Sequence, residues 1–317
     1  MRIHDDPPDL YLRAVPQGPA LPRMGGAYCP DIVPWGEALD PAPAALAEPP
    51  LWDEDPGRPL LPAVFNNVYV RCANATRSDV PGRLYLAVGA ASLPCWPDLL
   101  KPLPAPGGGD YVPLTVNGGQ NAALTTPFKC QPESATDTLA AWLVTRLHKP
   151  TPSDALDTVA DLKAFLENNA GYAQRSVAFG ITGSYTFAAQ YQQRNAAADM
   201  QLELRCHNCP VGWTLSVLPD RDDGPLRLEP FELTNSSQIV SLIKNVHARY
   251  EDVLTLRIDS HDLPPAPDAR VDLVLSVRVP GTTAPPILFR LGCHSWRAQP
   301  PSTDAATRGS TQHRSQP

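Results

Sequence analysis

The stretch Asn66-Asn67-Val68-Tyr69-Val70-Arg71-Cys72-Ala73-Asn74 decides the fold of this chain. Val68, Val70 and Cys72 share one face of an extended backbone, while Tyr69 and Arg71 take the other. A repeat of two residues is the period of a β-strand that packs one of its faces on a core. After a turn region at 74–82, the alternation resumes at Leu84, Leu86 and Val88, so a second strand is predicted there.

Further short strands are predicted along the rest of the chain, with turn signals about every 8–12 residues. They are 111–116, 139–147, 185–187, 202–206, 212–217, 226–228, 253–258 and 271–279. The segment 236–248 is predicted to be either a short helix or a loop. Such spacing is typical of sandwiches. The predicted fold class is therefore mostly β, with two immunoglobulin-like antiparallel β-sandwiches joined by one amphipathic helix.

The proline content supports this prediction. The chain has 38 prolines in 317 residues, more than twice the usual share of about 5%. Proline has no N–H and a fixed φ, so it is excluded from long helices and from central strands. A hydrophobic share of 43% still allows real cores. The composition therefore indicates short strands joined by rigid loops.

One helix is predicted over 153–170. Ser153 or Asp154 can cap its N-terminus, and acidic residues in its first turn suit the helix dipole. Gly171 is predicted to end the helix in the left-handed conformation. The apolar stripe of this helix comprises Leu156, Val159, Leu162, Phe165 and Leu166.

The helix divides the predicted organisation. Residues 1–62 form an irregular proline-rich segment packed on the first domain, because its tryptophans are costly to leave in water. Residues 63–150 form the first sandwich, 151–176 hold the bridging helix, and 177–298 form the second sandwich. The segment 299–317 is rich in Ser, Thr, Gln and Pro and is predicted to be a disordered tail.

Two short windows resemble known modules. The run Asn66-Asn67-Val68-Tyr69-Val70-Arg71 with Asn74 resembles the second-strand region of CARDB-like bacterial immunoglobulin-type modules. The run Cys209-Pro210-Val211-Gly212-Trp213-Thr214-Leu215, followed by Leu226-Arg227-Leu228, resembles the strand of NEW3-type immunoglobulin-like modules. The resemblance implies an immunoglobulin-like sandwich in each half and implies no catalytic residues, because such modules serve in adhesion, spacing or docking.

The net charge argues against nucleic acid as a partner, and the absence of a long apolar run argues against a membrane. The formal net charge is −7 and the basic residues are scattered, whereas a nucleic-acid binder needs a dense basic face. The first residues lack the apolar core of a secretory signal, and no apolar run approaches the about 20 residues of a membrane span. We expect a cytoplasmic protein with protein partners and no contact with nucleic acid or membrane. Export within a larger particle and assembly into an oligomer stay open.

Loop aromatics are the candidate binding residues. Trp35, Trp52 and Trp96 lie in proline-bordered loops. Tryptophans on a rigid sandwich supply a large contact area at low entropic cost, which favours recognition. The alternative interpretation is that they hold long loops against the sheet.

Cys206-His207-Asn208-Cys209 is the sharpest local motif. Two cysteines at this spacing can bind zinc or act as a redox pair, and Cys293 with His294 could complete a zinc site if the last strand returned beside 202–217. The competing interpretation places Cys206 on the core face of its strand, as a small hydrophobe. The sequence favours reduced thiols and no metal.

Other catalytic patterns are missing from the sequence. It has no G-x-S-x-G motif, no H-E-x-x-H spacing and no phosphate-binding lysine after the glycines at 107–109. The acidic runs at 5–9, 53–55 and 220–223 do not have the spacing of a calcium loop. We therefore predict no cofactor and a non-enzymatic structural or docking protein, a component suited to a multi-subunit assembly. The alternatives are an accessory module beside a separately encoded hydrolase, and a zinc or thiol enzyme built on the Cys206–Cys209 pair.

Overall fold

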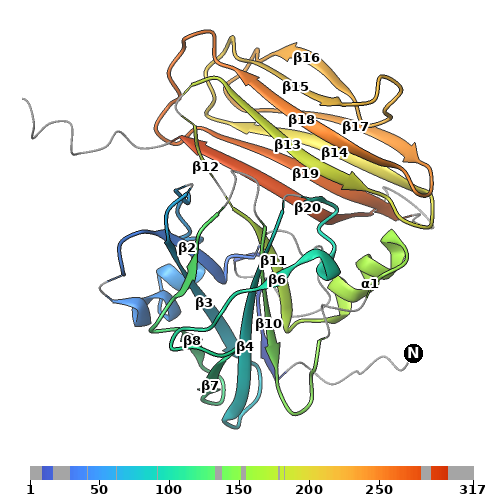
Figure 1. Ribbon diagram of the computed structural model, residues 1–317. Coiled ribbons are helices and arrows are strands. Elements are labelled where there is room, and N and C mark those ends of the chain that lie inside the picture. The colour runs from blue at the N-terminus through green and yellow to red at the C-terminus, as the bar shows by residue number, and fades with distance from the viewer. Residues whose placement is uncertain are drawn as a thin grey trace, which may run out of the picture.

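The computed structural model describes residues 9–16, 29–40, 42–61, 63–90, 92–132, 138–150, 155–177, 179–181, 183–279 and 287–298. It confirms the predicted mostly β class, with antiparallel sheets stacked as sandwiches (Figure 1). Within these ranges there is one α-helix, and none of the helices is long and apolar enough to span a bilayer. The predicted tail 299–317 lies outside the described residues, as does most of the acidic run at 5–9.

The elements follow one another in this order: β1 (Leu10–Tyr11), β2 (Ile32–Gly36), η1 (Pro43–Ala47), η2 (Leu51–Asp53), β3 (Asn66–Asn74), β4 (Val80–Gly89), β5 (Ser92–Leu93), η3 (Pro97–Leu99), β6 (Lys101–Pro102), β7 (Val112–Val116), β8 (Asn121–Ala123), β9 (Phe128–Cys130), β10 (Thr138–Val144), α1 (Val159–Asn168), β11 (Tyr172–Ser176), β12 (Phe179–Ile181), β13 (Tyr185–Gln192), β14 (Ala198–His207), β15 (Thr214–Pro219), β16 (Leu228–Glu232), β17 (Gln238–Val246), β18 (Glu251–Asp259), β19 (Arg270–Val279) and β20 (Ile287–Ala298).

The first sandwich is built around β3, the strand that the alternation at 66–74 predicts. β1 and β2 pair with β3 along one edge, and β8 and β9 pair along the other. The facing sheet has the order β11-β10-β4-β6, and β7 also pairs with β4. Val68, Val70 and Cys72 point into the core between the sheets. The described part of 1–62 therefore supplies two strands to this sandwich.

One side of the first sandwich is closed by backbone hydrogen bonds between its two sheets. The Leu12 amide donates to the Ala170 carbonyl at 2.9 Å, and the Cys29 amide donates to the Gln174 carbonyl at 3.0 Å. Trp142 in β10 is buried and stacks on Tyr85 of β4, with ring centroids 5.1 Å apart.

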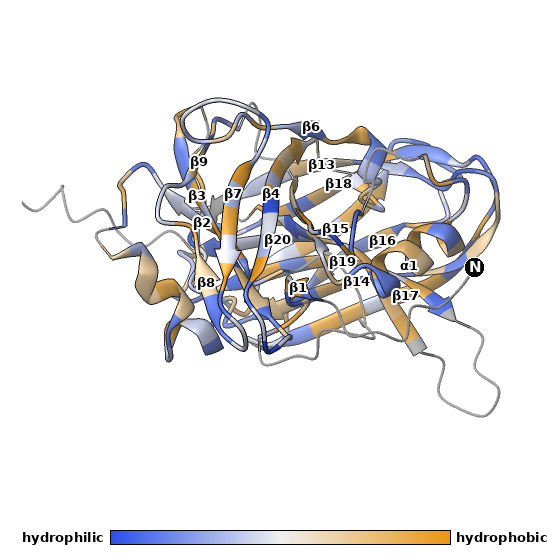
Figure 2. Cartoon of the chain, turned by 90° about the horizontal axis from the view of Figure 1, so that it is seen from below, coloured by the Kyte–Doolittle hydropathy of each residue, from blue (hydrophilic) through white to orange (hydrophobic). Residues whose placement is uncertain are grey.

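The second sandwich has two five-stranded sheets, ordered β12-β20-β19-β14-β17 and β16-β15-β18-β13-β5. Hydrophobic and hydrophilic residues alternate along these strands (Figure 2), as the period-two pattern predicts. The prediction of a helix or loop at 236–248 is wrong, because β17 pairs with β14 at every residue from Gln238 to Val246. The backbone groups of this segment are therefore satisfied by a sheet ladder.

The two halves share strands. β5 lies in the first half of the sequence but pairs in parallel with β13 of the second sandwich. β11, which was predicted to be part of the bridging segment, pairs with β10. Asp98 and Arg194 form an ion pair between the two halves, in which both carboxylate oxygens lie 2.7 Å from Nη2 of the guanidinium. The predicted domain boundaries stay a prediction. The β5–β13 pairing and the Asp98–Arg194 ion pair are contacts between the two sandwiches.

The helix is shorter than predicted. α1 begins at Val159, after non-helical residues 155–158, and Ser153 and Asp154 lie outside the described residues. The cap is Thr158, whose hydroxyl accepts a hydrogen bond from the Asp161 amide at 3.1 Å. Of the predicted apolar stripe, Val159, Leu162 and Leu166 are buried on the helix. Phe165 is partly buried against the core, and Leu156 precedes the helix.

The role predicted for Gly171 is also wrong. Its φ is not in the left-handed region; the helix ends at Asn168, and Asn169 is its C-cap. A Cβ at position 171 would lie 3.1 Å from the Leu143 carbonyl oxygen, so the glycine permits a close approach between backbones.

Replacing Thr158 by alanine is expected to lower the free energy of unfolding by about 1 kcal/mol, because a helix amide loses its acceptor. Thr158→Ser keeps the hydroxyl and serves as the matched control. Urea unfolding of both variants measures the difference. Equal stabilities would show that this cap contributes nothing.

Candidate functional site

Two of the three predicted recognition tryptophans are buried by the chain itself. Trp52 is 9% exposed, and the Arg13 guanidinium lies 3.4 Å from the centre of its ring. Trp96 is 1% exposed, with Arg194 at 4.0 Å from its ring. Its indole N–H donates to the Gln192 carbonyl at 3.0 Å. These contacts favour the packing interpretation.

Trp35 is the most accessible of the three. It is half-buried in β2 and meets Tyr69 edge to face, with centroids 6.2 Å apart. The Arg58 guanidinium covers the ring at 3.7 Å. A binding role for these tryptophans stays a prediction, and of the three only Trp35 offers part of its ring to a partner.

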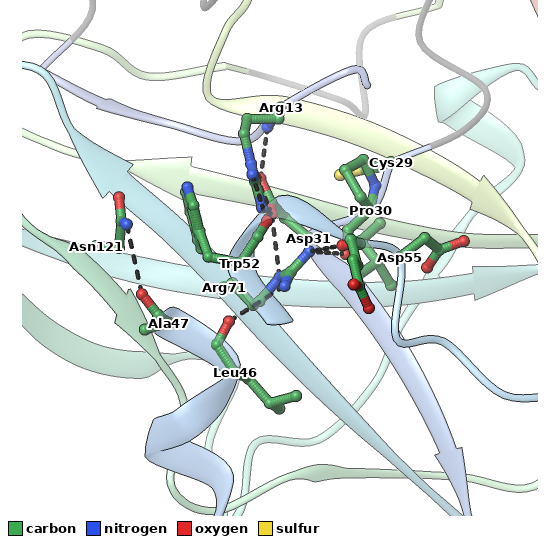
Figure 3. Close-up of polar contacts among 12 residues, drawn as sticks. Arg13, Cys29, Pro30, Asp31, Leu46, Ala47, Trp52, Asp55, Arg71 and Asn121 are labelled. Atoms are coloured by element: carbon green, nitrogen blue, oxygen red, sulfur yellow. Dashed lines mark hydrogen bonds and ion pairs between the residues drawn. The ribbon is translucent and has the colours of Figure 1, made fainter. Parts of the chain in front are cut away.

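A buried charge cluster that the sequence did not reveal holds the N-terminal segment on β3 (Figure 3). Asp31 binds Arg13 at 2.5 Å and Arg71 at 3.2 Å, and all three side chains are almost fully buried. Burial lowers the pKa of Arg71, while the Asp31 charge opposes that change.

The remaining donors of Arg71 go to backbone carbonyls, so the guanidinium has no free N–H to offer a substrate. Its acceptors are the carbonyls of Pro30, Leu46, Leu51 and Glu54. The cluster is therefore a structural clamp that ties η1 and η2 to the sheet. Asp31 and Arg71 are 40 positions apart, and no sequence pattern predicts that they form a pair. Only the fold brings them together.

The four residues of the zinc alternative do not converge. Cys206 pairs with Val271 and Cys293 pairs with Val274. Because Val271 and Val274 are three residues apart on β19, their pairing partners lie on opposite faces of the sheet. His294 lies two strands from Cys206, about 10 Å away at the usual strand spacing. Zinc ligands must all lie within about 2.3 Å of the metal.

Among the residues that the structure describes, no group of three or more His, Cys, Asp or Glu side chains could hold a metal ion. The acidic run at 53–55 contributes Asp55 to ion pairs with Arg175 and Arg297, at 2.7 Å and 3.1 Å. That carboxylate links β11 of the first sandwich to β20 of the second.

The described cysteines are buried, which disfavours thiol chemistry. A hydrogen bond to Cys209 and burial both raise the pKa of Cys206. Burial raises the pKa of Cys293 to about 11 and that of Cys95 to about 12. A thiol must ionise to act as a nucleophile, so the raised pKa values oppose that role for Cys206, Cys293 and Cys95. The hydrogen bond with Cys206 lowers the pKa of Cys209 instead.

Purified protein is accordingly expected to contain no stoichiometric zinc, and a chelator should leave its Tm unchanged. Structural zinc would contribute folding free energy directly, so its removal would lower Tm. Elemental analysis and a thermal melt with and without chelator are the measurements. About one equivalent of zinc per chain would contradict this prediction.

His294 makes stability depend on pH. It is 2% exposed and lies 4.9 Å from the Phe187 ring, and burial lowers its pKa from 6.5 to about 3. The folded pKa is below the unfolded one, so the unfolded chain binds more protons between these values. Stability is complete above the unfolded pKa and falls as the pH drops below it.

Lowering the pH from 7.5 to 5 should therefore cost about 2 kcal/mol of unfolding free energy through His294 alone. Urea titrations at both pH values should show that loss in the wild type. The variant His294→Phe should lose about 2 kcal/mol less between the two pH values. The same pH dependence in both proteins would rule out His294 as the cause.

The candidate binding site is a groove of about 540 Å³ in the first sandwich. It opens on the side opposite the closing bonds of Leu12 and Cys29, where β7 ends one sheet and β8 ends the other. Its floor is the core itself, formed by Val70, Cys72 and Leu84.

The walls of the groove are uncharged. β7 supplies Val112, Leu114 and Thr115, the 122–126 segment forms the facing wall, and the loop at Pro106-Gly107 closes one end. Within the described ranges, β7 pairs only with β4 and β8 only with β3. The outer edges of both strands therefore border the opening. None of the residues that line this groove was predicted to be a binding residue.

Comparison with solved structures finds only low similarity. Red sea bream transglutaminase aligns over 77% of this chain and 30% of its own, at 11% identity and a TM-score of 0.24. CfaE, the adhesive subunit of CFA/I fimbria of enterotoxigenic Escherichia coli, aligns over 92% of this chain and 93% of its own, at 6% identity and a TM-score of 0.20. The CupB6 tip adhesin from Pseudomonas aeruginosa aligns over 76% and 91%, at 9% identity and a TM-score of 0.18.

No protein-family model matches the chain, and no curated protein matches it either. The structural likenesses extend to β-rich architecture and carry no argument about activity or partners. The resemblance to CARDB-like and NEW3-type modules stays a prediction. Function must therefore be inferred from the site itself.

Proposed function

We propose that this chain is a non-enzymatic docking protein whose groove between β7 and β8 binds an extended segment of a protein partner. The observation that supports this is the asymmetry of the first sandwich. Backbone hydrogen bonds close one side, whereas the other side opens directly onto core residues. An extended segment can add to an exposed strand edge through main-chain hydrogen bonds, while its side chains fill pockets.

The lining sets the chemistry of the partner segment. It carries no charged side chain; half-buried Val112 and Leu114 and buried Leu124 line it above the floor, with threonines at its rim. A charged group placed there would lose water without gaining an ion pair. The occupant is therefore an uncharged strand with apolar residues at every second position, so that one of its faces meets the core.

The test compares partner recovery by tagged full-length protein from its native host. Leu114→Arg places a charge in the groove and should reduce recovery at least about tenfold, the scale of a binding hot spot. Thr186→Arg introduces the same residue on the exposed face of β13 and should leave recovery unchanged. Equal recovery by both variants, or hydrolase activity without any partner, would overturn the proposal.

A further inference from the structure

The edge strand β17 is an open edge on the second sandwich. β17 ends the sheet β12-β20-β19-β14-β17 and, among the described strands, pairs with β14 alone. Ile239 is 61% exposed and Ile243 is 45% exposed on its outer face. A long apolar edge strand with free backbone groups is a template for pairing with another chain.

The neighbouring edge strand, β16, is protected against pairing with another chain. β16 ends the other sheet, and its five residues include Glu229, Pro230 and Glu232. Charge and proline are the usual means of preventing edge-to-edge association. β17 has nine residues, no proline and the single charge of Lys244. The two edges are adjacent in sequence, yet only one is protected.

The sequence of β17 is nearly palindromic in hydropathy about Ser241. Ile239 and Ile243 lie two residues on either side, on the outer face. Val240 and Leu242 flank Ser241 on the half-buried inner face and pack against the core. In an antiparallel pair of identical strands centred on Ser241, each Ile239 therefore lies opposite the other copy's Ile243.

We infer that β17 pairs with β17 of a second copy of this chain, antiparallel and centred on Ser241, to form a two-fold dimer with a continuous ten-stranded sheet. Such an interface is self-complementary, as a two-fold contact requires. In this register Lys244 meets Gln238 of the other copy, so no like charges face one another. The inference is independent of the groove, which belongs to the first sandwich.

Charge substitutions in the full chain test both pairing and register. Ile239→Glu places a carboxylate beside Arg205, its partner on β14, so the fold keeps a compatible neighbour. In the dimer, the carboxylate lies opposite Ile243. The dissociation constant, measured by sedimentation, should rise at least about tenfold.

The double variant Ile239→Glu/Ile243→Lys should restore the dimer, because each Glu then lies opposite a Lys of the other copy. Within one chain these two positions are four residues apart, about 13 Å along a strand, so they cannot pair intramolecularly. A wild type that stays monomeric up to its solubility limit would overturn the inference. A double variant no better than the single one would overturn the register.

Cysteine cross-linking gives an independent readout. Ser241→Cys should form a disulfide-linked dimer under mild oxidation, because identical residues at the centre have Cβ atoms about 5 Å apart. Asn245→Cys is the matched control on the same exposed face, since it would lie about 27 Å from its own copy. Cross-linking of both variants to the same extent, or of Asn245→Cys alone, would contradict the proposed pairing.

Discussion

Replacing Asp31 by alanine is expected to lower the free energy of unfolding by about 3–5 kcal/mol. The carboxylate binds two buried guanidinium groups, at 2.5 Å from Arg13 and 3.2 Å from Arg71. Its removal leaves two positive charges facing one another away from water. Removing one partner of a buried ion pair destabilises the fold by far more than the intact pair stabilises it, because the remaining charges stay desolvated.

Asp31→Asn should cost less, because the amide oxygen still accepts one of these hydrogen bonds. Asp223→Ala removes a carboxylate from a pair in which it is 78% exposed, and should leave stability unchanged. Equilibrium urea unfolding of the three variants ranks them. If Asp31→Ala were as stable as Asp223→Ala, the cluster would not hold the N-terminal segment.

Replacing Trp96 by alanine should cost about 3–5 kcal/mol, the range for deleting a buried tryptophan. The ring is almost fully buried, its N–H bonds the Gln192 carbonyl, and Arg194 covers one face. The residue follows β5, which pairs with β13. The truncation therefore opens a cavity where the first half of the chain meets the second.

Trp96→Phe retains an aromatic ring but loses the N–H, and should cost clearly less than Trp96→Ala. Calorimetry also reports cooperativity: Trp96→Ala should lower Tm and weaken the coupling between the halves. A Trp96→Ala protein with wild-type Tm would show that this ring is dispensable and would return it to the recognition candidates.

Period-two patterns predicted half of the strands in the described residues, because burial on one face dictates them. The alternation at 66–74 and 84–88 predicted β3 and β4, and 271–279 predicted β19. β17 was missed for a physical reason. Its apolar residues Ile239, Leu242, Ile243 and Val246 also follow the spacing of a helical stripe, and only pairing with β14 selects the strand.

The candidate sites were harder to predict than the strands. The tryptophans are conspicuous in the sequence, but the arginines that cover their rings lie elsewhere in the sequence. The clamp at Asp31 joins residues that only the fold brings together. The groove lies where the two sheets are separated at one side. A groove of this kind has no sequence motif by which it could be predicted. The zinc alternative needed Cys206 and Cys293 on the same face of the sheet, and they lie on opposite faces. Which face each residue takes depends on the strand register, which the sequence does not show.

The most direct test of the docking proposal is site-specific photocrosslinking in the native host. A photoreactive residue replaces Leu114 in the groove wall or, as the control, Thr186 on β13. We expect a discrete covalent adduct with a protein partner from position 114 and none from position 186. Adducts from both positions alike, or from position 186 only, would contradict the claim that this groove is where the chain binds its partner.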